Sequence, residues 1–213
     1  MSEDNKQKTR FIAIAGNIGA GKSSLTGLLA KHFKWQAYYE SVDDNPYLSD
    51  FYEDMRRWSF NLQIYFLSSR FKKHKEMLNK QTSLVQDRTI YEDAEIFAKN
   101  LNDMGLMSER DYKNYRALFN EMTTYLQPPD LLVYLRAQVP TLVRQIQQRG
   151  RKYENTIRID YLERLNLLYE DWIDRYPYEK LIIDTDDIDY VNKQEDLGKV
   201  IDLVDQRLFG LFN

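Results

Sequence analysis

Short apolar runs alternate along this chain with longer segments of helical periodicity. Five runs have the length and composition of buried strands, and they lie at 10–15, 36–39, 83–86, 131–135 and 181–183. The intervals between them carry apolar residues three and four positions apart, which is the spacing of helices that bury one face. Strands that alternate with helices are typical of α/β proteins, so the pattern predicts a five-stranded parallel sheet with helices on both faces.

One predicted helix, 52–75, has apolar residues in most directions around its axis and is therefore expected in the interior. Its polar residues Tyr52, Gln63 and Arg70 are separated by 11 and 7 positions. If the helix is continuous, these three side chains share a narrow stripe on one face. Buried polar groups need hydrogen-bond partners, and a bound ligand is one source of them.

The following predicted helix, 91–101, places Asp93 and Phe97 one turn apart. Asp93 is a candidate counter-ion for Arg70, and Gln63 is a candidate hydrogen-bond partner for a nucleobase that stacks on Phe97. The alternative is a purely structural ion pair beside a satisfied core amide. The residues alone leave both interpretations open.

Composition narrows the class of protein. With 213 residues, 43% of them hydrophobic, the chain can bury one substantial core, so we expect a single domain over 10–213 after a disordered lead at 1–9. A net charge of −3 argues against a nucleic-acid polymer as partner, and the absence of cysteine excludes disulfides and thiolate metal sites. No run approaches the length of a membrane span, so we expect a cytoplasmic protein.

The strongest chemical signal is the motif G-x-x-x-x-G-K-S, which follows the first predicted strand at 16–23. Its glycines let backbone N–H groups turn toward phosphate oxygens, its lysine places a cation on the β and γ phosphates, and its serine can ligate Mg²⁺. The chain is therefore expected to bind a nucleoside triphosphate. The predicted contacts are Gly16, Asn17, Ile18, Gly19, Ala20, Gly21, Lys22, Ser23 and Ser24.

Charged residues follow the next two predicted strands: Glu40 after the second, and Asp87 and Arg88 after the third. If both strands neighbour the first, these side chains point at the γ phosphate. Phosphoryl transfer needs a carboxylate for the attacking hydroxyl, a carboxylate for Mg²⁺ and cations for the transferring group. Ser23, Asp87 and Glu40 are the candidate metal ligands. Taken singly, either acid is equally well explained as a helix cap or a solvated loop residue.

A basic group surrounds Gly150 at the end of a helical stretch. Arg149 and Arg151 flank that glycine, and Arg144 lies one to two turns earlier. We interpret the segment at about 144–158 as a lid whose guanidinium groups close over the triphosphate. The alternative is favourable charge at a helix C-terminus that Gly150 caps.

In combination, these motifs resemble those of the deoxynucleoside kinase family, which includes deoxycytidine, deoxyguanosine and deoxyadenosine kinases. The resemblance extends over 11–191, and the Asn45-Pro46 pair is similar to the bacterial branch of the family. The segments that carry it are the phosphate loop, 40–42, 58–60 leading to Gln63 and Arg70, 87–89 with Asp93, and 149–151.

The resemblance implies a role for each of these positions. Glu40 would take the proton of the 5′-hydroxyl, although the Asp87 position is an alternative acceptor, and Asp87 would organise Mg²⁺. Arg88 would neighbour the hydroxyl and the incoming phosphoryl group. Tyr52 and Glu154 would hold the sugar 3′-hydroxyl and leave little room for a 2′-hydroxyl.

The resemblance also implies how the two bases are held. Gln63 would read the base edge, Phe97 would stack on the base, and Arg70 with Asp93 would line the far end of the pocket. The adenine of ATP would lie near Asp184, Asp186 and Asp187. We therefore expect ATP with Mg²⁺ as donor, a homodimer, and a purine deoxynucleoside as acceptor, deoxyadenosine before deoxyguanosine and with deoxycytidine close behind.

Two other functions share part of this pattern. A nucleoside monophosphate kinase has the same fold, but it needs additional arginines for the phosphate of its acceptor. A nucleotide-dependent switch is suggested by 192–195, which resembles the guanine-reading motif Asn-Lys-x-Asp but has Glu195 in place of aspartate. The glycine that a switch carries after its third strand is replaced here by Ile90.

Overall fold

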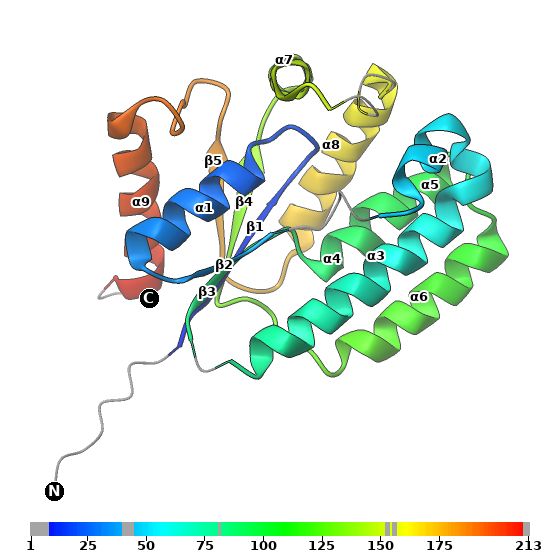
Figure 1. The fold of residues 1–213 in the computed structure, drawn as a ribbon, viewed down its shortest axis with the longest axis horizontal. Coiled ribbons are helices and arrows are strands. Elements are labelled where there is room, and N and C mark those ends of the chain that lie inside the picture. The colour runs from blue at the N-terminus through cyan, green and yellow to red at the C-terminus, as the bar shows by residue number, and fades with distance from the viewer. Residues whose placement is uncertain (1–8, 40–44, 81, 152–153, 155–156, 211–213) are drawn as a thin grey trace, which may run out of the picture.

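The computed structural model describes residues 9–39, 45–80, 82–151, 154 and 157–210. Its centre is a sheet of five strands, all parallel, in the order β2-β3-β1-β4-β5 (Figure 1). This confirms the predicted fold class. The strands are β1 (Phe11–Gly16), β2 (Gln36–Tyr38), β3 (Leu84–Asp87), β4 (Leu131–Arg136) and β5 (Lys180–Asp184).

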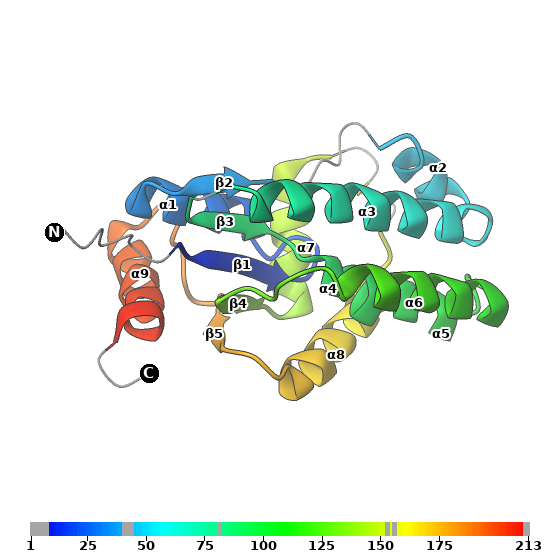
Figure 2. The same cartoon turned by 90° about the horizontal axis from the view of Figure 1, so that it is seen from below.

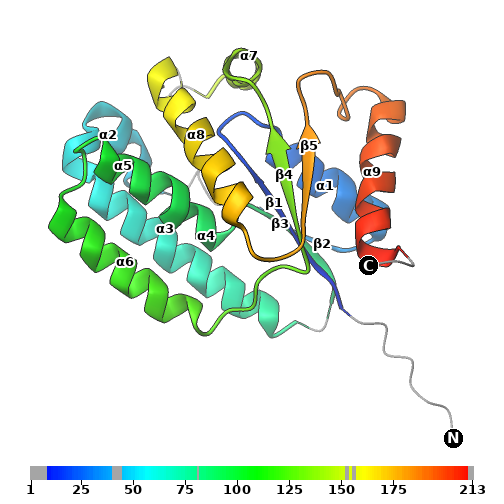
Figure 3. The same ribbon diagram turned by 180° about the vertical axis from the view of Figure 1, so that it is seen from behind.

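Helices cover both faces of this sheet, as the strand and helix pattern predicts. Figure 3 shows α1 and α9 on one face, and α3, α6 and α8 on the other. Within the described ranges, no helix is long and apolar enough to cross a membrane. The helices are α1 (Lys22–Phe33), α2 (Leu48–Glu53), α3 (Met55–Leu78), α4 (Ile90–Glu92), the π-helix η1 (Asp93–Ala98), α5 (Lys99–Asp103), α6 (Glu109–Thr123), α7 (Val139–Arg149), α8 (Ile159–Arg175) and α9 (Gln194–Phe209).

Two hydrophobic clusters hold these layers together, and β1 contributes to both because successive side chains of a strand point to opposite faces. Ile12 and Ile14 pack with residues of α1 and α9. Ala13 and Ala15 pack in the cluster that includes α3 and α8. All four side chains are fully buried, so the strand that leads into the phosphate loop is anchored on both sides.

The order of the strands corrects one expectation. β3 is the neighbour of β1, as expected, but β2 pairs only with β3 and lies at the edge of the sheet (Figure 2). The burial of the two strands accounts for this order: every residue of β3 is buried, whereas none of the three residues of β2 is. A short, partly exposed strand belongs at an edge, where one side meets solvent.

The predicted continuous helix over 52–75 is wrong at its start. The chain breaks at Asp54, whose backbone has φ −138° and ψ 84°, and α3 begins one residue later. The Asp54 carboxylate accepts a hydrogen bond from the Arg57 backbone N–H, which makes it an N-cap. Tyr52 therefore lies on α2, and it does not share a helical stripe with Gln63 and Arg70.

The predicted helix over 91–101 is present but irregular. Its middle, Asp93–Ala98, is a π-helix between the short helices α4 and α5. Single π-helical turns within helices are rare and occur frequently at functional sites. This one carries both Asp93 and Phe97, the two residues of the segment for which the sequence predicts a role.

Candidate active site

The predicted phosphate loop joins the end of β1 to the start of α1. Two of its glycines adopt left-handed backbone conformations, Gly19 with φ 85° and Gly21 with φ 89°. A Cβ atom at Gly19 would lie 2.8 Å from the Leu142 carbonyl oxygen, so a side chain has no room there. Lys22 is buried, and its ammonium group donates to the Asn17 carbonyl at 2.8 Å across the loop. The loop therefore has the turned backbone and the inward lysine that phosphate binding needs.

Asp87 meets this loop at the end of β3. Its Cα pairs in register with Ile14 of β1, and its Oδ2 atom accepts a hydrogen bond from the Ser23 hydroxyl at 2.5 Å. The other carboxylate oxygen, Oδ1, is buried and has no hydrogen-bond partner in the part of the chain that the structure describes. The structure thus brings together Lys22, Ser23 and Asp87, as the sequence predicts. Glu40 lies outside the described residues.

These oxygens form a donor set that fits Mg²⁺. A hydroxyl and a carboxylate are hard oxygen ligands of the kind that this ion prefers, and proteins hold it through one or two carboxylates together with the phosphates of a substrate. The buried Oδ1 atom of Asp87 supports the fit, because a buried carboxylate oxygen without a donor is costly unless a cation or water completes it.

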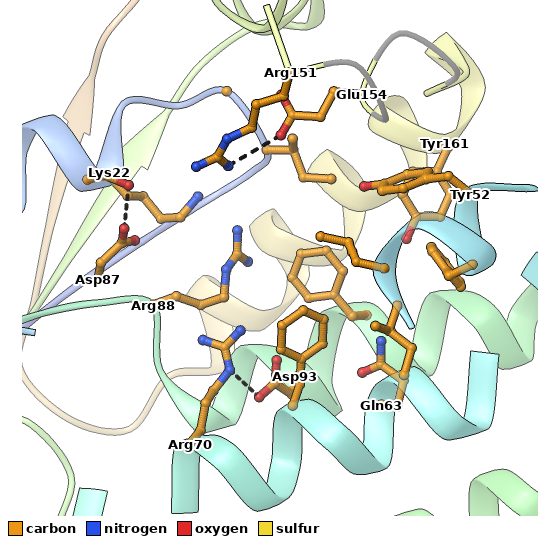
Figure 4. Close-up of a pocket in the computed structure, with 18 of the residues that line it drawn as sticks. Lys22, Tyr52, Gln63, Arg70, Asp87, Arg88, Asp93, Arg151, Glu154 and Tyr161 are labelled. Atoms are coloured by element: carbon orange, nitrogen blue, oxygen red, sulfur yellow. Dashed lines mark hydrogen bonds and ion pairs between the residues drawn. The ribbon is translucent and has the colours of Figure 1, made fainter. Parts of the chain in front are cut away.

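Arg88 has an unusual backbone. Its φ of 64° lies in the left-handed region, which few residues with a side chain adopt, and its N–H donates to the Ile14 carbonyl at 3.0 Å. The guanidinium lies over the Phe97 ring, 4.6 Å from the ring centroid, and its Nη1 atom donates to the Tyr169 hydroxyl at 2.8 Å. The side chain lines the pocket beside Lys22 while remaining 4% exposed (Figure 4).

The far end of the same pocket holds the polar residues that the sequence predicts for base recognition. Arg70 Nε and Asp93 Oδ2 lie 2.6 Å apart as a buried ion pair, with 7% and 2% of their side chains exposed. Gln63 is also buried, and its Oε1 atom has no partner among the described residues. Figure 4 shows Gln63, Arg70 and Asp93 along one wall of the cavity. Phe97 lines the cavity too, with Arg88 over its ring.

Tyr52 and Glu154 also line the pocket, and Figure 4 shows Glu154 beside Arg151 and Tyr52 apart from both. Glu154 is 5% exposed, and it accepts two hydrogen bonds from Arg149, at 2.5 and 3.0 Å. Arg151 Nη1 lies 3.6 Å from the same carboxylate. The acid predicted for the sugar therefore contacts both of the arginines predicted for the lid.

A second hollow continues from the phosphate loop on the side of α7. Arg144, Gln145, Arg149 and Arg151 line it from the lid, and the segment 185–193 lines it from beyond β5. Asp186 and Asp187, which the sequence predicts near the donor nucleotide, belong to that wall. Asp184 lies elsewhere: it lines a neighbouring hollow and its carboxylate is 3.5 Å from Arg136 Nη1.

Three site residues were not identified from the sequence. Tyr161, which is 3% exposed, lines the pocket. Glu92 and Tyr169 contact Arg88 from behind. A signal existed for Glu92, because Thr89 and Glu92 form a capping box whose spacing is readable in the sequence. Tyr161 and Tyr169 had no such signal, because the chain has 16 tyrosines and the helical pattern does not single out any of them.

A parallel α/β sheet with a phosphate loop after β1 and an Asp-Arg pair after β3 defines a P-loop phosphotransferase. Comparison with known proteins specifies which one. The family model described as deoxynucleoside kinase matches residues 12–209. The chain belongs to the deoxynucleoside kinase family, which confirms the class of enzyme predicted from the motifs, and these comparisons give no support to a monophosphate kinase or a switch protein.

Individual relatives agree with this assignment. A deoxyadenosine/deoxycytidine kinase of Bacillus subtilis (strain 168) is 43% identical over 209 residues, which cover 96% of this chain and 95% of the relative. A deoxyguanosine kinase of Lactobacillus johnsonii is 39% identical over 208 residues, covering 92% of each chain. The solved structure of a deoxyadenosine kinase from M. mycoides with bound dATP has a TM-score of 0.82 at 30% identity, covering 92% of this chain and 99% of that one.

Proposed function

We propose that the protein transfers the γ-phosphoryl group of ATP to the 5′-hydroxyl of a deoxynucleoside, with deoxyadenosine as the preferred acceptor. One observation carries the proposal: a single pocket is lined at one end by Lys22, Ser23 and Asp87, and at the other by Gln63 and Asp93. A nucleoside whose base contacts the far end thus presents its sugar toward the phosphate loop (Figure 4).

The residues of the near end perform the transfer. The 5′-oxygen forms a bond to the γ phosphorus while the bond from that phosphorus to the β,γ-bridging oxygen breaks, and ADP leaves. Glu40 accepts the proton of the 5′-hydroxyl, Lys22 holds the β and γ phosphates, and Arg88 balances charge on the transferring group. Ser23 and Asp87 hold Mg²⁺, which neutralises phosphate charge when bound. Catalysis then depends chiefly on position and electrostatics.

The sugar subsite selects deoxyribose by crowding. In this proposal Tyr52 and Glu154 hold the 3′-hydroxyl. Support comes from their common place in the pocket wall and from the two hydrogen bonds by which Arg149 fixes Glu154. Because the carboxylate is held in place, it cannot easily withdraw from a 2′-hydroxyl. The lid arginines approach the triphosphate at the same time, so sugar binding and donor binding favour each other.

The base subsite favours a base that carries an amino group. Gln63 Oε1 is a buried acceptor without a partner in the described chain, and adenine and cytosine each offer an exocyclic N–H₂ group. Arg70 and Asp93 add a donor and an acceptor beyond it. Thymine offers a methyl group, which a charged pair receives poorly. The relatives named for deoxyadenosine, deoxycytidine and deoxyguanosine support this set of bases, and deoxyadenosine is our first choice within it.

The proposal is tested with labelled ATP and a panel of ribonucleosides and deoxyribonucleosides. We expect kcat/KM for deoxyadenosine to exceed that for thymidine by at least about tenfold, since a methyl group alone shifts discrimination by this much. We expect adenosine to be a poor substrate because of its 2′-hydroxyl. A panel in which thymidine is the best substrate would contradict the assignment of the base, and no transfer to any nucleoside would contradict the proposed function.

Replacement of Gln63 by alanine tests the base contact. We expect the KM for deoxyadenosine to rise about tenfold with little change in kcat, because the contact is made equally in the ground state and the transition state. The matched control is Ser59→Ala on the same helix, which removes a buried hydroxyl that donates to the Leu106 carbonyl at 2.9 Å. Equal KM values for the two variants would show that Gln63 has a structural role.

Three further properties belong to the same proposal. We propose Mg²⁺ as the bound ion, on the strength of the Ser23 and Asp87 oxygens. We propose a homodimer and a cytoplasmic location, which rest on the family and on the composition of the chain.

A further inference from the structure

A carboxylate behind the pocket links the two catalytic segments of the chain. Glu92 is fully buried and lies at the end of α4, four residues after Arg88. Its Oε1 atom accepts from the Tyr169 hydroxyl at 2.8 Å, from the Gly16 N–H at 3.4 Å and from Arg88 Nη1 at 3.5 Å. Gly16 begins the phosphate loop, so one oxygen contacts both the loop and the arginine beside it.

Helix capping explains the contacts of the other carboxylate oxygen of Glu92, but not those of Oε1. The Oε2 atom of Glu92 accepts from the Thr89 N–H at 2.7 Å, which is one of the two bonds of a capping box, and it also accepts from the Thr89 hydroxyl at 3.2 Å. Such a box works equally well on a protein surface. Here the second oxygen points away from the helix end, into the interior, and a buried carboxylate is retained there only because charged and polar donors complete it.

The Tyr169 hydroxyl completes a closed set of contacts. It accepts a hydrogen bond from Arg88 Nη1 at 2.8 Å and donates one to Glu92 at 2.8 Å. Burial raises the pKa of Tyr169 well above its ordinary value, so the phenol keeps the proton that it donates. The side chain is fully buried on α8, and its ring stacks on that of Tyr134 with centroids 5.6 Å apart. Tyr169 is therefore rigid support for the arginine.

We propose that Glu92 and Tyr169 are positioning residues that fix the guanidinium of Arg88 relative to the phosphate loop. The inference rests on the proposed function, in which Arg88 faces the transferring phosphoryl group. Tyr169 and Glu92 hold Nη1 from behind, and the Phe97 ring lies under the guanidinium. The flexible arginine is thus oriented before substrate arrives, and a preorganised cation needs no rearrangement as charge develops.

The structure offers a matched pair of variants for the test. Tyr169→Phe removes the hydroxyl between Arg88 and Glu92. Tyr134→Phe removes the hydroxyl of the ring that stacks on Tyr169, and this hydroxyl donates to Glu170 at 2.9 Å in a partly buried hydrogen bond. Each variant thus loses one tyrosine–glutamate hydrogen bond from the same stack, but only Tyr169 contacts the arginine.

We expect Tyr169→Phe to lower kcat about tenfold, with the KM values for deoxyadenosine and ATP within about twofold of wild type, because the loss falls on the transition state. We expect Tyr134→Phe to lower the melting temperature about as much as Tyr169→Phe does, but to leave kcat unchanged. Glu92→Gln is expected to lower kcat more than Tyr169→Phe does, because it removes a charge as well as an acceptor. Equal kcat values for the two tyrosine variants would overturn the proposal.

A double-variant cycle separates an effect through Arg88 from a general one. In an Arg88→Lys background, Tyr169→Phe is expected to have little further effect on kcat, since the group that it orients is gone. If the losses in log kcat of Arg88→Lys and Tyr169→Phe are additive in the double variant, the proposal would also be overturned. The wild-type enzyme in the same assay tests the proposed function independently: if it transfers phosphate to no deoxynucleoside, that function fails, whereas differences among active variants test only the positioning role.

Discussion

Asp87→Asn is expected to lower kcat by about two to three orders of magnitude, because metal ions contribute several kcal/mol to phosphoryl transfer and each 1.4 kcal/mol is a factor of ten. The amide keeps the shape of the side chain and the contact to Ser23, but it loses the negative charge that we propose holds Mg²⁺. We also expect the Mg²⁺ concentration needed for half-maximal rate to rise. Steady-state rates over a Mg²⁺ titration, at saturating ATP and deoxyadenosine, measure both effects.

The same change from carboxylate to amide elsewhere on the sheet provides the control. Asp130 accepts a hydrogen bond from the Phe11 N–H at 2.8 Å, at the end of the sheet away from the phosphate loop, so Asp130→Asn should leave kcat and the Mg²⁺ requirement unchanged. Glu40→Gln, assayed in parallel, is expected to depress kcat severely without raising the Mg²⁺ requirement. If Asp87→Asn instead keeps its Mg²⁺ response and Glu40→Gln keeps its turnover, Asp87 is the proton acceptor.

Asp93→Ala is expected to lower the free energy of unfolding by about 3 to 5 kcal/mol, which is the usual cost of removing one member of a buried ion pair. Arg70 would be left as a charge in the interior with its nearest acid gone, since the two groups are 2.6 Å apart and almost fully buried. For a chain of this length that loss corresponds to a fall of about 6 to 20 °C in melting temperature. Thermal unfolding followed by circular dichroism measures it.

An exposed ion pair of similar length serves as the reference. Lys99 and Asp103 are 2.7 Å apart with 35% and 37% of their side chains exposed, so Asp103→Ala is expected to cost less than about 1 kcal/mol. The double variant Arg70→Met/Asp93→Ala should recover much of the lost stability and shift base preference toward thymidine. If Asp93→Ala and Asp103→Ala lower the free energy of unfolding equally, burial does not strengthen the Arg70–Asp93 pair.

Much of the site could be predicted because it is local in the sequence. The phosphate loop is a contiguous motif after an apolar strand, and Asp87 and Arg88 directly follow another. Since parallel strands present their carboxyl ends at one edge of a sheet, the convergence of Asp87 on Ser23 follows from fold class alone. The Arg70–Asp93 pair was predictable because two charges on helices with apolar faces need each other.

What could not be predicted depends on tertiary packing. The apolar pattern continues through Asp54, so nothing in the hydrophobic spacing marks the break that places Tyr52 on α2. The π-helical turn at Asp93–Ala98 has i→i+5 in place of i→i+4 hydrogen bonds, and the apolar pattern of so short a segment does not reveal this change. The spacing from Thr89 marks Glu92 as a capping residue, but its partner Tyr169 is 77 residues away, so their contact appears only when α8 packs against the sheet.

The backbone at Arg88 carries strain that its side chain offsets. A left-handed conformation costs a residue with a side chain about 1 kcal/mol or more, and glycine would adopt it freely. Glycine at this place would relieve that strain, but it would also remove the guanidinium 3.5 Å from the buried Glu92 carboxylate, and the loss of one member of a buried ion pair costs about 3 to 5 kcal/mol. The sharp turn between β3 and α4 is therefore a place where glycine, although the backbone favours it, would make the protein less tolerant of heat.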